Sequence, residues 1–213
     1  MKDATLTESS RRTMRAAVFT WPKTWSWMWL ALLLAARAPA SGAEEAAIPP
    51  ESVKAAFLFR FGEYVEWPLV SPPGSQSRGP FIIAVLGEPA VAAELRRILP
   101  GRTLQGRNVV VHELTQIEDL ENSDAADADI LYLGAETKGA LGHAIATAIQ
   151  IHTPLLVVSN AAEGLAAGAA INFVTRDSRI RFEVSPAAAQ TAKVKLSSRL
   201  FGVAVRVVSS AQN

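Results

Sequence analysis

The chain has 213 residues and no cysteine, with 21 Lys and Arg against 20 Asp and Glu. Without cysteine it cannot use thiolate catalysis, attach haem through a CxxCH motif, bind zinc through thiolates or form a disulfide. Residues 1–43 hold six of the basic and two of the acidic residues, so the other 170 residues carry 15 basic and 18 acidic residues, a net charge of −3. A mildly acidic domain of this size can bury a sizeable core but is a poor candidate for nucleic-acid binding.

The N-terminal segment has the layout of a secretory signal peptide. Basic residues precede an uncharged, mostly apolar run over residues 24–36, and small residues follow that run. The run is shorter than the about 20 residues that a membrane-spanning helix needs. We therefore expect a signal peptide over 1–43, cleaved after Ala40 or Ala43, and an exported domain over 44–213. An uncleaved N-terminal anchor and export by the twin-arginine route remain alternatives.

A helix is predicted over residues 51–66, where the exported part begins. Pro68 ends it, because the residue before a proline is disfavoured in a helix. Apolar residues at helical spacing form a stripe that we expect to face the core. The stripe consists of Val53, Ala56, Phe57, Phe61, Tyr64 and Val65. Phe59 and Trp67 fall outside it, where large aromatic side chains suit a protein–protein contact.

The middle of the chain alternates between apolar runs and amphipathic segments. The run at residues 81–86 is apolar throughout, which is typical of a strand buried on both faces of a parallel sheet. The same patterns predict further strands and helices. Strands are expected at 109–111, 130–133 and 154–159, and helices at 88–99 and 138–150.

The C-terminal part predicts a hairpin and a final helix. Apolar stretches at 171–174 and 180–184 flank a turn at Asp177 and Ser178. Ser185 followed by proline begins the final helix, which we expect to continue to about residue 200. The predicted fold is therefore a single three-layer α/β domain. Its sheet is mixed but mostly parallel and flanked by helices, with a C-terminal antiparallel hairpin and helix.

The titratable residues show no spacing typical of a catalytic or metal site. His112, His143 and His152 are dispersed, without the paired spacing of metal ligands. The acidic segment 118–129 has no glycine for a calcium-loop turn, so we expect a solvated loop. Neither a nucleotide-binding glycine motif nor a GxSxG or SxxK nucleophile motif is present. We therefore expect no enzymatic activity, no metal and no cofactor.

Four arginines and one tryptophan are the candidate partner- or ligand-binding residues. Arg176, Arg179 and Arg181 lie on the predicted hairpin, Arg60 lies on the first helix and Trp67 follows that helix. Strand alternation places Arg179 and Arg181 on one face, where they can bind an anion or an acidic partner. The ordinary alternative is a solvated sheet face.

Several segments resemble, in the same order, the YfiR family of periplasmic proteins. They are KAAFLFRFGEYVEWP at 54–68, GRTLQGR at 101–107, INFV at 171–174, RIRFEV at 179–184 and AKVKLSSRL at 192–200. The chain departs from the family pattern at Arg60 and Ser185, where relatives often have Asn. It also has Ala128-Asp129 where they often have Cys-His, so the disulfide-based control of some relatives is not expected here.

The resemblance implies a regulatory role without catalysis. YfiR-like proteins are periplasmic repressors that bind the sensor region of an inner-membrane diguanylate cyclase of the YfiN type and hold the cyclase inactive. An outer-membrane lipoprotein of the YfiB type can sequester the repressor. The partners that the resemblance implies are therefore the periplasmic domain of such a cyclase, a lipoprotein of this type and a second copy of the chain.

A second interpretation comes from the residues alone. The chain could be a periplasmic small-ligand-binding protein that works with a sensor kinase or an outer-membrane transporter. Open α/β sheets usually bind ligands at the carboxyl ends of their strands. The site would then be formed by the loops after Leu86, Leu133 and Ser159.

Overall fold

The structure, a computed structural model, describes residues 48–68, 79–122, 124–137, 139–152 and 154–208. The expected signal peptide and its cleavage sites lie outside these residues. No described helix is both long enough and apolar enough to span a bilayer.

An eight-stranded sheet forms the centre of the described domain, in the order β10-β8-β7-β6-β5-β2-β4-β3. The strands from β4 through β2, β5 and β6 to β7 are parallel to one another. β3 is antiparallel to β4 and β8 is antiparallel to β7, whereas β10 is parallel to β8. This arrangement confirms the predicted mixed, mostly parallel sheet. The strands are β2 (Phe81–Leu86), β3 (Thr103–Leu104), β4 (Arg107–Leu114), β5 (Ile130–Leu133), β6 (Leu156–Ser159), β7 (Ile171–Arg176), β8 (Arg179–Val184) and β10 (Arg206–Val207).

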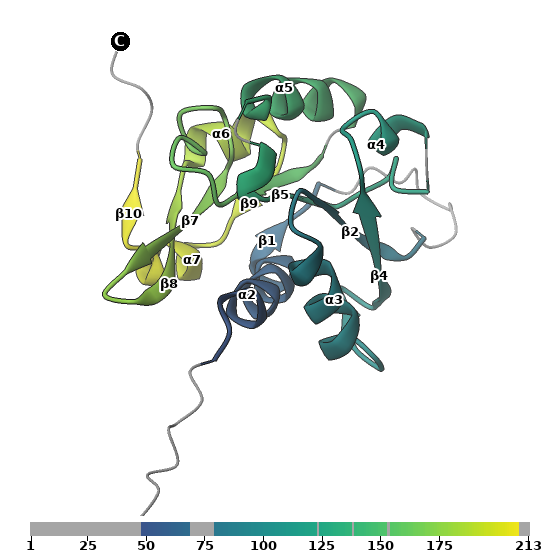
Figure 1. Ribbon diagram of the computed structural model, residues 1–213, viewed down its shortest axis with the longest axis horizontal. Coiled ribbons are helices and arrows are strands. Elements are labelled where there is room, and N and C mark those ends of the chain that lie inside the picture. Colours follow the sequence, from purple (N-terminus) through teal and green to yellow (C-terminus); the bar gives the residue numbers. More distant parts are fainter. Residues whose placement is uncertain (1–47, 69–78, 123, 138, 153, 209–213) are drawn as a thin grey trace, which may run out of the picture. The chain divides into compact units, whose positions relative to one another are not determined.

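Helices cover both faces of the sheet, which gives the predicted three layers (Figure 1). Below the sheet in this view lie α2 (Pro50–Tyr64) and α3 (Pro89–Ile98), and above it lie α4 (Asp119–Asn122) and α5 (Leu141–Ile151). Alternate residues of β2 enter the two separate cores, because successive side chains of a strand point to opposite faces. This explains why its sequence is apolar at every position.

Helix α2 buries a different set of residues from the one expected. Phe59 and Trp67, predicted to lie outside the core, are 7% and 9% exposed and belong to its largest apolar cluster. Phe57 and Tyr64 are only partly buried, and Ala56 is exposed. The prediction was wrong because α2 packs against α3 as well as the sheet, so its buried surface is wider than one stripe.

The single C-terminal helix that we expected is replaced by four short elements. They are α6 (Pro186–Thr191), β9 (Lys195–Leu196), α7 (Ser198–Val203) and β10. The predicted start is confirmed, because the Ser185 hydroxyl accepts a hydrogen bond from the Ala188 N–H. Lys193 adopts a positive φ of 56° soon after α6, and Val194 and Leu196 are buried while Lys195 is exposed. This alternation of buried and exposed residues is typical of a strand, and β9 pairs with β1 (Val65–Glu66).

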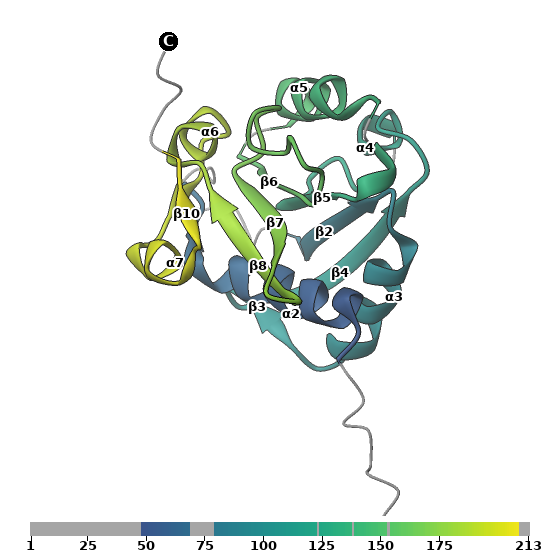
Figure 2. The same cartoon turned by 60° about the vertical axis from the view of Figure 1, so that its left-hand side comes forward.

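The β7–β8 hairpin is confirmed with its turn at Asp177 and Ser178. Both residues have positive φ, 48° and 58°, which is the conformation of a type I′ turn. Such a turn matches the twist of the two strands. It directs the hairpin tip alongside α2 (Figure 2).

Asp129, which we expected in a solvated acidic loop, is instead buried at 5% exposure. Its carboxylate accepts a hydrogen bond from the Ile82 N–H at 2.9 Å and forms an ion pair with Arg107. The Arg107 guanidinium also donates to the Pro80 carbonyl at 2.7 Å. One arginine thereby joins the amino ends of three adjacent strands, β4, β2 and β5.

Asp129→Ala should lower the free energy of unfolding by about 3–5 kcal/mol, because it leaves a mostly buried guanidinium without its counter-ion. Urea unfolding at neutral pH measures the change. Glu66→Ala, which removes the exposed ion pair between Glu66 and Lys195, is the matched control and should cost no more than about 1 kcal/mol. Equal losses in the two variants would contradict the structural role of Asp129.

Candidate functional site

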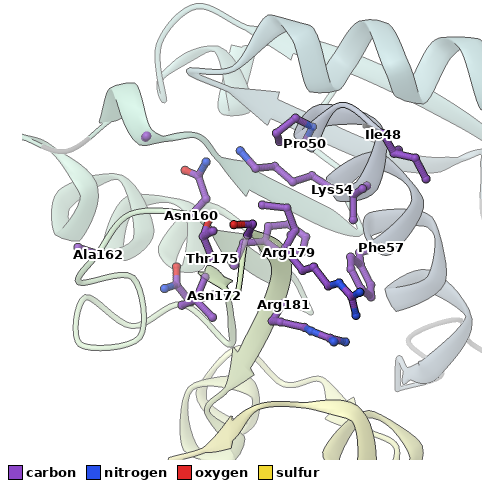
Figure 3. A pocket seen from close by; sticks show the side chains of 16 residues that line it. Ile48, Pro50, Lys54, Phe57, Asn160, Ala162, Asn172, Thr175, Arg179 and Arg181 are labelled. Carbon is purple, nitrogen blue, oxygen red and sulfur yellow. The ribbon is translucent and has the colours of Figure 1, made fainter. Parts of the chain in front are cut away.

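A cavity of about 1000 Å³ opens between α2, the β7–β8 hairpin and the loops that follow β5 and β6 (Figure 3). The loops contribute Ala135 and Asn160, which follow the carboxyl ends of these parallel strands. The cavity therefore lies where the sequence placed a ligand site, at the loops after Leu133 and Ser159. The loop after Leu86 does not line it but contributes Glu88, which contacts two of its lining residues.

The short pairing between β6 and β7 creates this opening. β6 ends at Ser159 and pairs with only two residues of β7, Ile171 and Asn172. β7 continues to Arg176 with β8 alone as its partner. The outer half of the hairpin thus extends past the sheet, and its free edge forms one wall of the cavity.

Three hydrogen-bond donors converge on the Glu88 carboxylate beside the cavity. Lys54 Nζ lies 2.6 Å from one carboxylate oxygen, Asn160 Nδ2 lies 2.9 Å from the other, and the Tyr132 hydroxyl also donates to it. Lys54 belongs to α2, Asn160 to the loop after β6, and Tyr132 to β5. The Lys54 side chain is only 10% exposed, so Glu88 compensates its charge inside the domain.

Tyr132 is a permanent donor in this network. Burial raises the pKa of its hydroxyl well above the ordinary value, and the hydrogen bond to Glu88 and the carboxylate's charge raise it further. The side chain has no exposed surface and its ring packs against Phe173, a wall residue of the cavity. The network therefore links the strand ends to the hairpin.

Of the five predicted site residues, the structure brings together Arg179 and Arg181. Both are exposed, both line the cavity, and neither has a carboxylate within ion-pair distance among the described residues. Arg176 lies on the same hairpin but does not line the cavity, and its guanidinium is 3.9 Å from the buried Glu183.

Arg60 and Trp67 lie apart from this cavity. The Arg60 side chain is 61% exposed and forms an ion pair with Glu63 at 2.7 Å. The hydrogen bond to Glu63 raises the pKa of the Arg60 guanidinium. The Trp67 ring packs edge-on against Phe81, with 5.3 Å between ring centroids. Its burial makes Trp67 part of the core.

The sequence interpretation missed the polar residues inside the cavity. Lys54, Asn160 and Asn172 all line it. Asn160 directly follows a predicted strand, a position where polar residues often bind ligands, and this signal could have identified it. The amide oxygens of Asn160 and Asn172 are buried, and neither accepts a hydrogen bond within the described part of the chain. The Asn172 oxygen lies against Gly164, so what these side chains present to the cavity is not their buried oxygens.

Metal ligation has no structural basis in the described ranges. No three His, Cys, Asp or Glu side chains within them lie close enough together to hold a metal ion. What the cavity offers is an apolar surface, amide groups and two arginines.

Tyr132→Phe should change how stability depends on pH. The folded-state pKa of Tyr132 lies above the unfolded value of about 10, so its contribution is complete below that pH and is lost as pH rises. Above pH about 10, Tyr132 ionises in the unfolded chain but not in the folded protein. The free energy of unfolding of the unsubstituted protein should therefore fall by up to about 1.4 kcal/mol per pH unit, and Tyr132→Phe should not show this fall.

Urea unfolding at a series of pH values between neutral and about 11 measures the effect. Tyr64→Phe removes the chain's other tyrosine hydroxyl and is the matched variant. If the two variants show the same dependence of stability on pH, the decline above pH about 10 cannot be assigned to Tyr132.

Comparison with known proteins identifies a family for this chain. No curated protein matches the chain. A conserved domain protein from Vibrio cholerae O1 biovar El Tor is 14% identical over 76% of this chain and 61% of that chain, with a TM-score of 0.49. An ABC domain in complex with L-Trp from Streptococcus pneumoniae is 8% identical over 60% of this chain and 55% of that chain, with a TM-score of 0.44.

The chain spans less than two thirds of either solved structure, and neither likeness is strong enough to carry an argument. The family model described as YfiR/HmsC-like matches residues 51–205, which include nearly all of the described domain. The chain therefore belongs to the YfiR/HmsC-like family.

Proposed function

We propose that the protein is an exported, non-catalytic regulator that binds the periplasmic sensor region of an inner-membrane diguanylate cyclase. In this role it holds the cyclase inactive and lowers cyclic di-GMP. The observation that carries the proposal is family membership across residues 51–205, because the YfiR/HmsC-like family implies a regulator of cyclic di-GMP signalling.

Repression requires the protein to discriminate between two states of its partner. A binder with equal affinity for both states shifts nothing, however tightly it binds. A preference of about 4 kcal/mol for the inactive state would shift the ratio of the two states roughly a thousandfold. The regulator can therefore work through binding alone.

The arginines of the hairpin indicate that the partner contacts the protein through an acidic surface. Arg179 and Arg181 are exposed and have no carboxylate partner within the described residues, so binding would not have to break an internal ion pair. Complementary charge accelerates association and fixes the orientation of the complex. The hairpin is thus the best-supported contact with the sensor region.

Deleting the gene should raise intracellular cyclic di-GMP, because the cyclase loses its repressor. Restoring the gene should return the level to that of the parent strain. Mass spectrometry of nucleotide extracts measures the change in cyclic di-GMP. N-terminal sequencing of the restored protein tests export separately, because cleavage of the expected signal peptide should leave Ser41 or Glu44 as the first residue. An unchanged cyclic di-GMP level in a strain that expresses the protein would count against repression.

Arg179→Glu combined with Arg181→Glu should weaken binding to the purified sensor region at least about tenfold, or about 1.4 kcal/mol. Isothermal titration calorimetry measures the affinity, and circular dichroism should show an unchanged melting curve because both side chains are exposed. Arg199→Glu, a charge reversal on α7 outside the cavity, is the matched control. Equal affinity in all three proteins would place the contact elsewhere.

The cavity favours a second candidate function, a periplasmic small-ligand binder. Its volume of about 1000 Å³ and its position at strand carboxyl ends are typical of ligand sites in α/β proteins. Such a protein would work with a sensor kinase or an outer-membrane transporter. In that case deletion would abolish a ligand response and leave cyclic di-GMP unchanged.

A further inference from the structure

We propose that the outer face of β7, β8 and β10, which is the side turned away from α2, binds an extended acidic segment of the sensor region. On this face Arg176 and Arg206 join Arg179 and Arg181 in the contact. The inference rests on the proposed function and deepens it, because it names two further binding residues and the chemistry of the segment that they bind.

The register of the hairpin places its three arginines on the outer face. Phe173 and Phe182 are paired across the two strands and pack against the same phenylalanine ring of α2, so they mark the inner face. Successive side chains of a strand point to opposite faces. Arg176, Arg179 and Arg181 therefore lie on the outer face, with Arg176 directly opposite Arg179.

Strand β10 adds a fourth arginine beside them (Figure 2). Arg206 is paired with Glu183 of β8, and its guanidinium donates a hydrogen bond to the Glu183 carboxylate at 2.6 Å. Glu183 is 4% exposed, and its carboxylate also lies 3.9 Å from the Arg176 guanidinium. The side chains of Arg176 and Arg206 nevertheless remain 64% and 59% exposed, so one buried carboxylate positions two guanidinium groups that a partner can reach.

The outer face has an excess of positive charge. Along the described parts of the three strands, Glu183 is the one carboxylate on this face, which leaves a formal excess of three charges over the four arginines. Like charges held this close together repel one another. An acidic partner would relieve this repulsion, whereas a basic partner would increase it.

The spacing of the arginines matches that of an extended segment. Residues on one face of a strand repeat at about 6.6 Å, and neighbouring strands lie about 4.8 Å apart. Arg179, Arg181 and the position that Arg206 occupies beside Glu183 therefore form a row with about this repeat. An extended segment with acidic residues at alternate positions has the same repeat, and each carboxylate can bind one guanidinium through paired hydrogen bonds.

An anionic membrane is the other kind of partner that such a face could attract. The apolar residue among the arginines is Val174, which is only half-exposed, so this face offers no large apolar side chain for insertion. Three excess charges attract a membrane less strongly than one acyl chain does, and one acyl chain alone gives only marginal binding. These observations favour the protein segment.

Two capped peptides of about seven residues test the face on the isolated exported protein. One alternates Glu with Ser, and the other alternates Gln with Ser and lacks the charges. Amide chemical shifts in NMR spectra of the isotope-labelled protein report affinity and location. We expect the Glu peptide to shift resonances of β8 and β10 and to bind at least about tenfold more tightly than the Gln peptide.

Three variants test the two newly assigned residues with the Glu peptide and with the purified sensor region. Arg176→Met should weaken both complexes at least about threefold. Arg206→Met combined with Glu183→Gln should do the same, although it leaves the net charge of the face unchanged. Arg199→Met removes the same charge from α7, which packs on the inner side of the sheet through Leu200, and should bind like the parent protein. Arg176 is exposed, so this variant should fold even where the double variant does not.

The inference is overturned if the Glu peptide shifts no resonances of β8 and β10, or if Arg176→Met and Arg199→Met bind equally well. Tighter binding to phosphatidylglycerol vesicles than to the Glu peptide would also overturn it, because the face would then belong to a membrane contact. The peptide titration uses no cyclase, so its failure would leave the repressor proposal standing. An unchanged cyclic di-GMP level on gene deletion would instead remove the sensor region as the partner and leave the acidic-segment site standing.

Discussion

The burial of the central sheet on both faces is the constraint on which the rest of the structure depends. All six residues of β2 are 6% exposed or less, and two separate apolar cores occupy the two faces of the sheet. No sheet face is left to bind anything in this central region. Within the sheet, only the edges and the ends of the strands remain accessible, which is where the cavity and the hairpin lie.

Buried charges tie the two ends of the parallel strands to their surroundings. At the amino ends Arg107 and Asp129 connect three strands, and at the carboxyl ends Glu88 connects α2, β5 and the loop after β6. In each case one carboxylate accepts several hydrogen bonds and pairs with a mostly buried basic side chain, Arg107 or Lys54. The result is a rigid frame from which the hairpin extends.

The sequence predicted those elements whose burial follows a simple rule. Residues 81–86 were apolar at every position and form a strand buried on both sides, and the turn at Asp177 and Ser178 closes the expected hairpin. Phe59 and Asp129 could not be placed in this way. Their burial depends on α3 and on Arg107, partners that no local period reveals. The same limit applies to Lys54, whose counter-ion is 34 residues away.

Because β6 pairs with only two residues of β7, the hairpin is attached to the sheet at one end and its tip extends beyond it. Its inner half shares the hydrogen bonds of the sheet, whereas its outer half is held by its own ladder and by the packing of β8 against α2, where Ile180 contacts the core. A segment of this kind can open without unfolding the domain, so its amides should exchange with solvent sooner than those of β2. The end of β8 that carries Arg179 and Arg181 can thus move while the frame behind it keeps its structure.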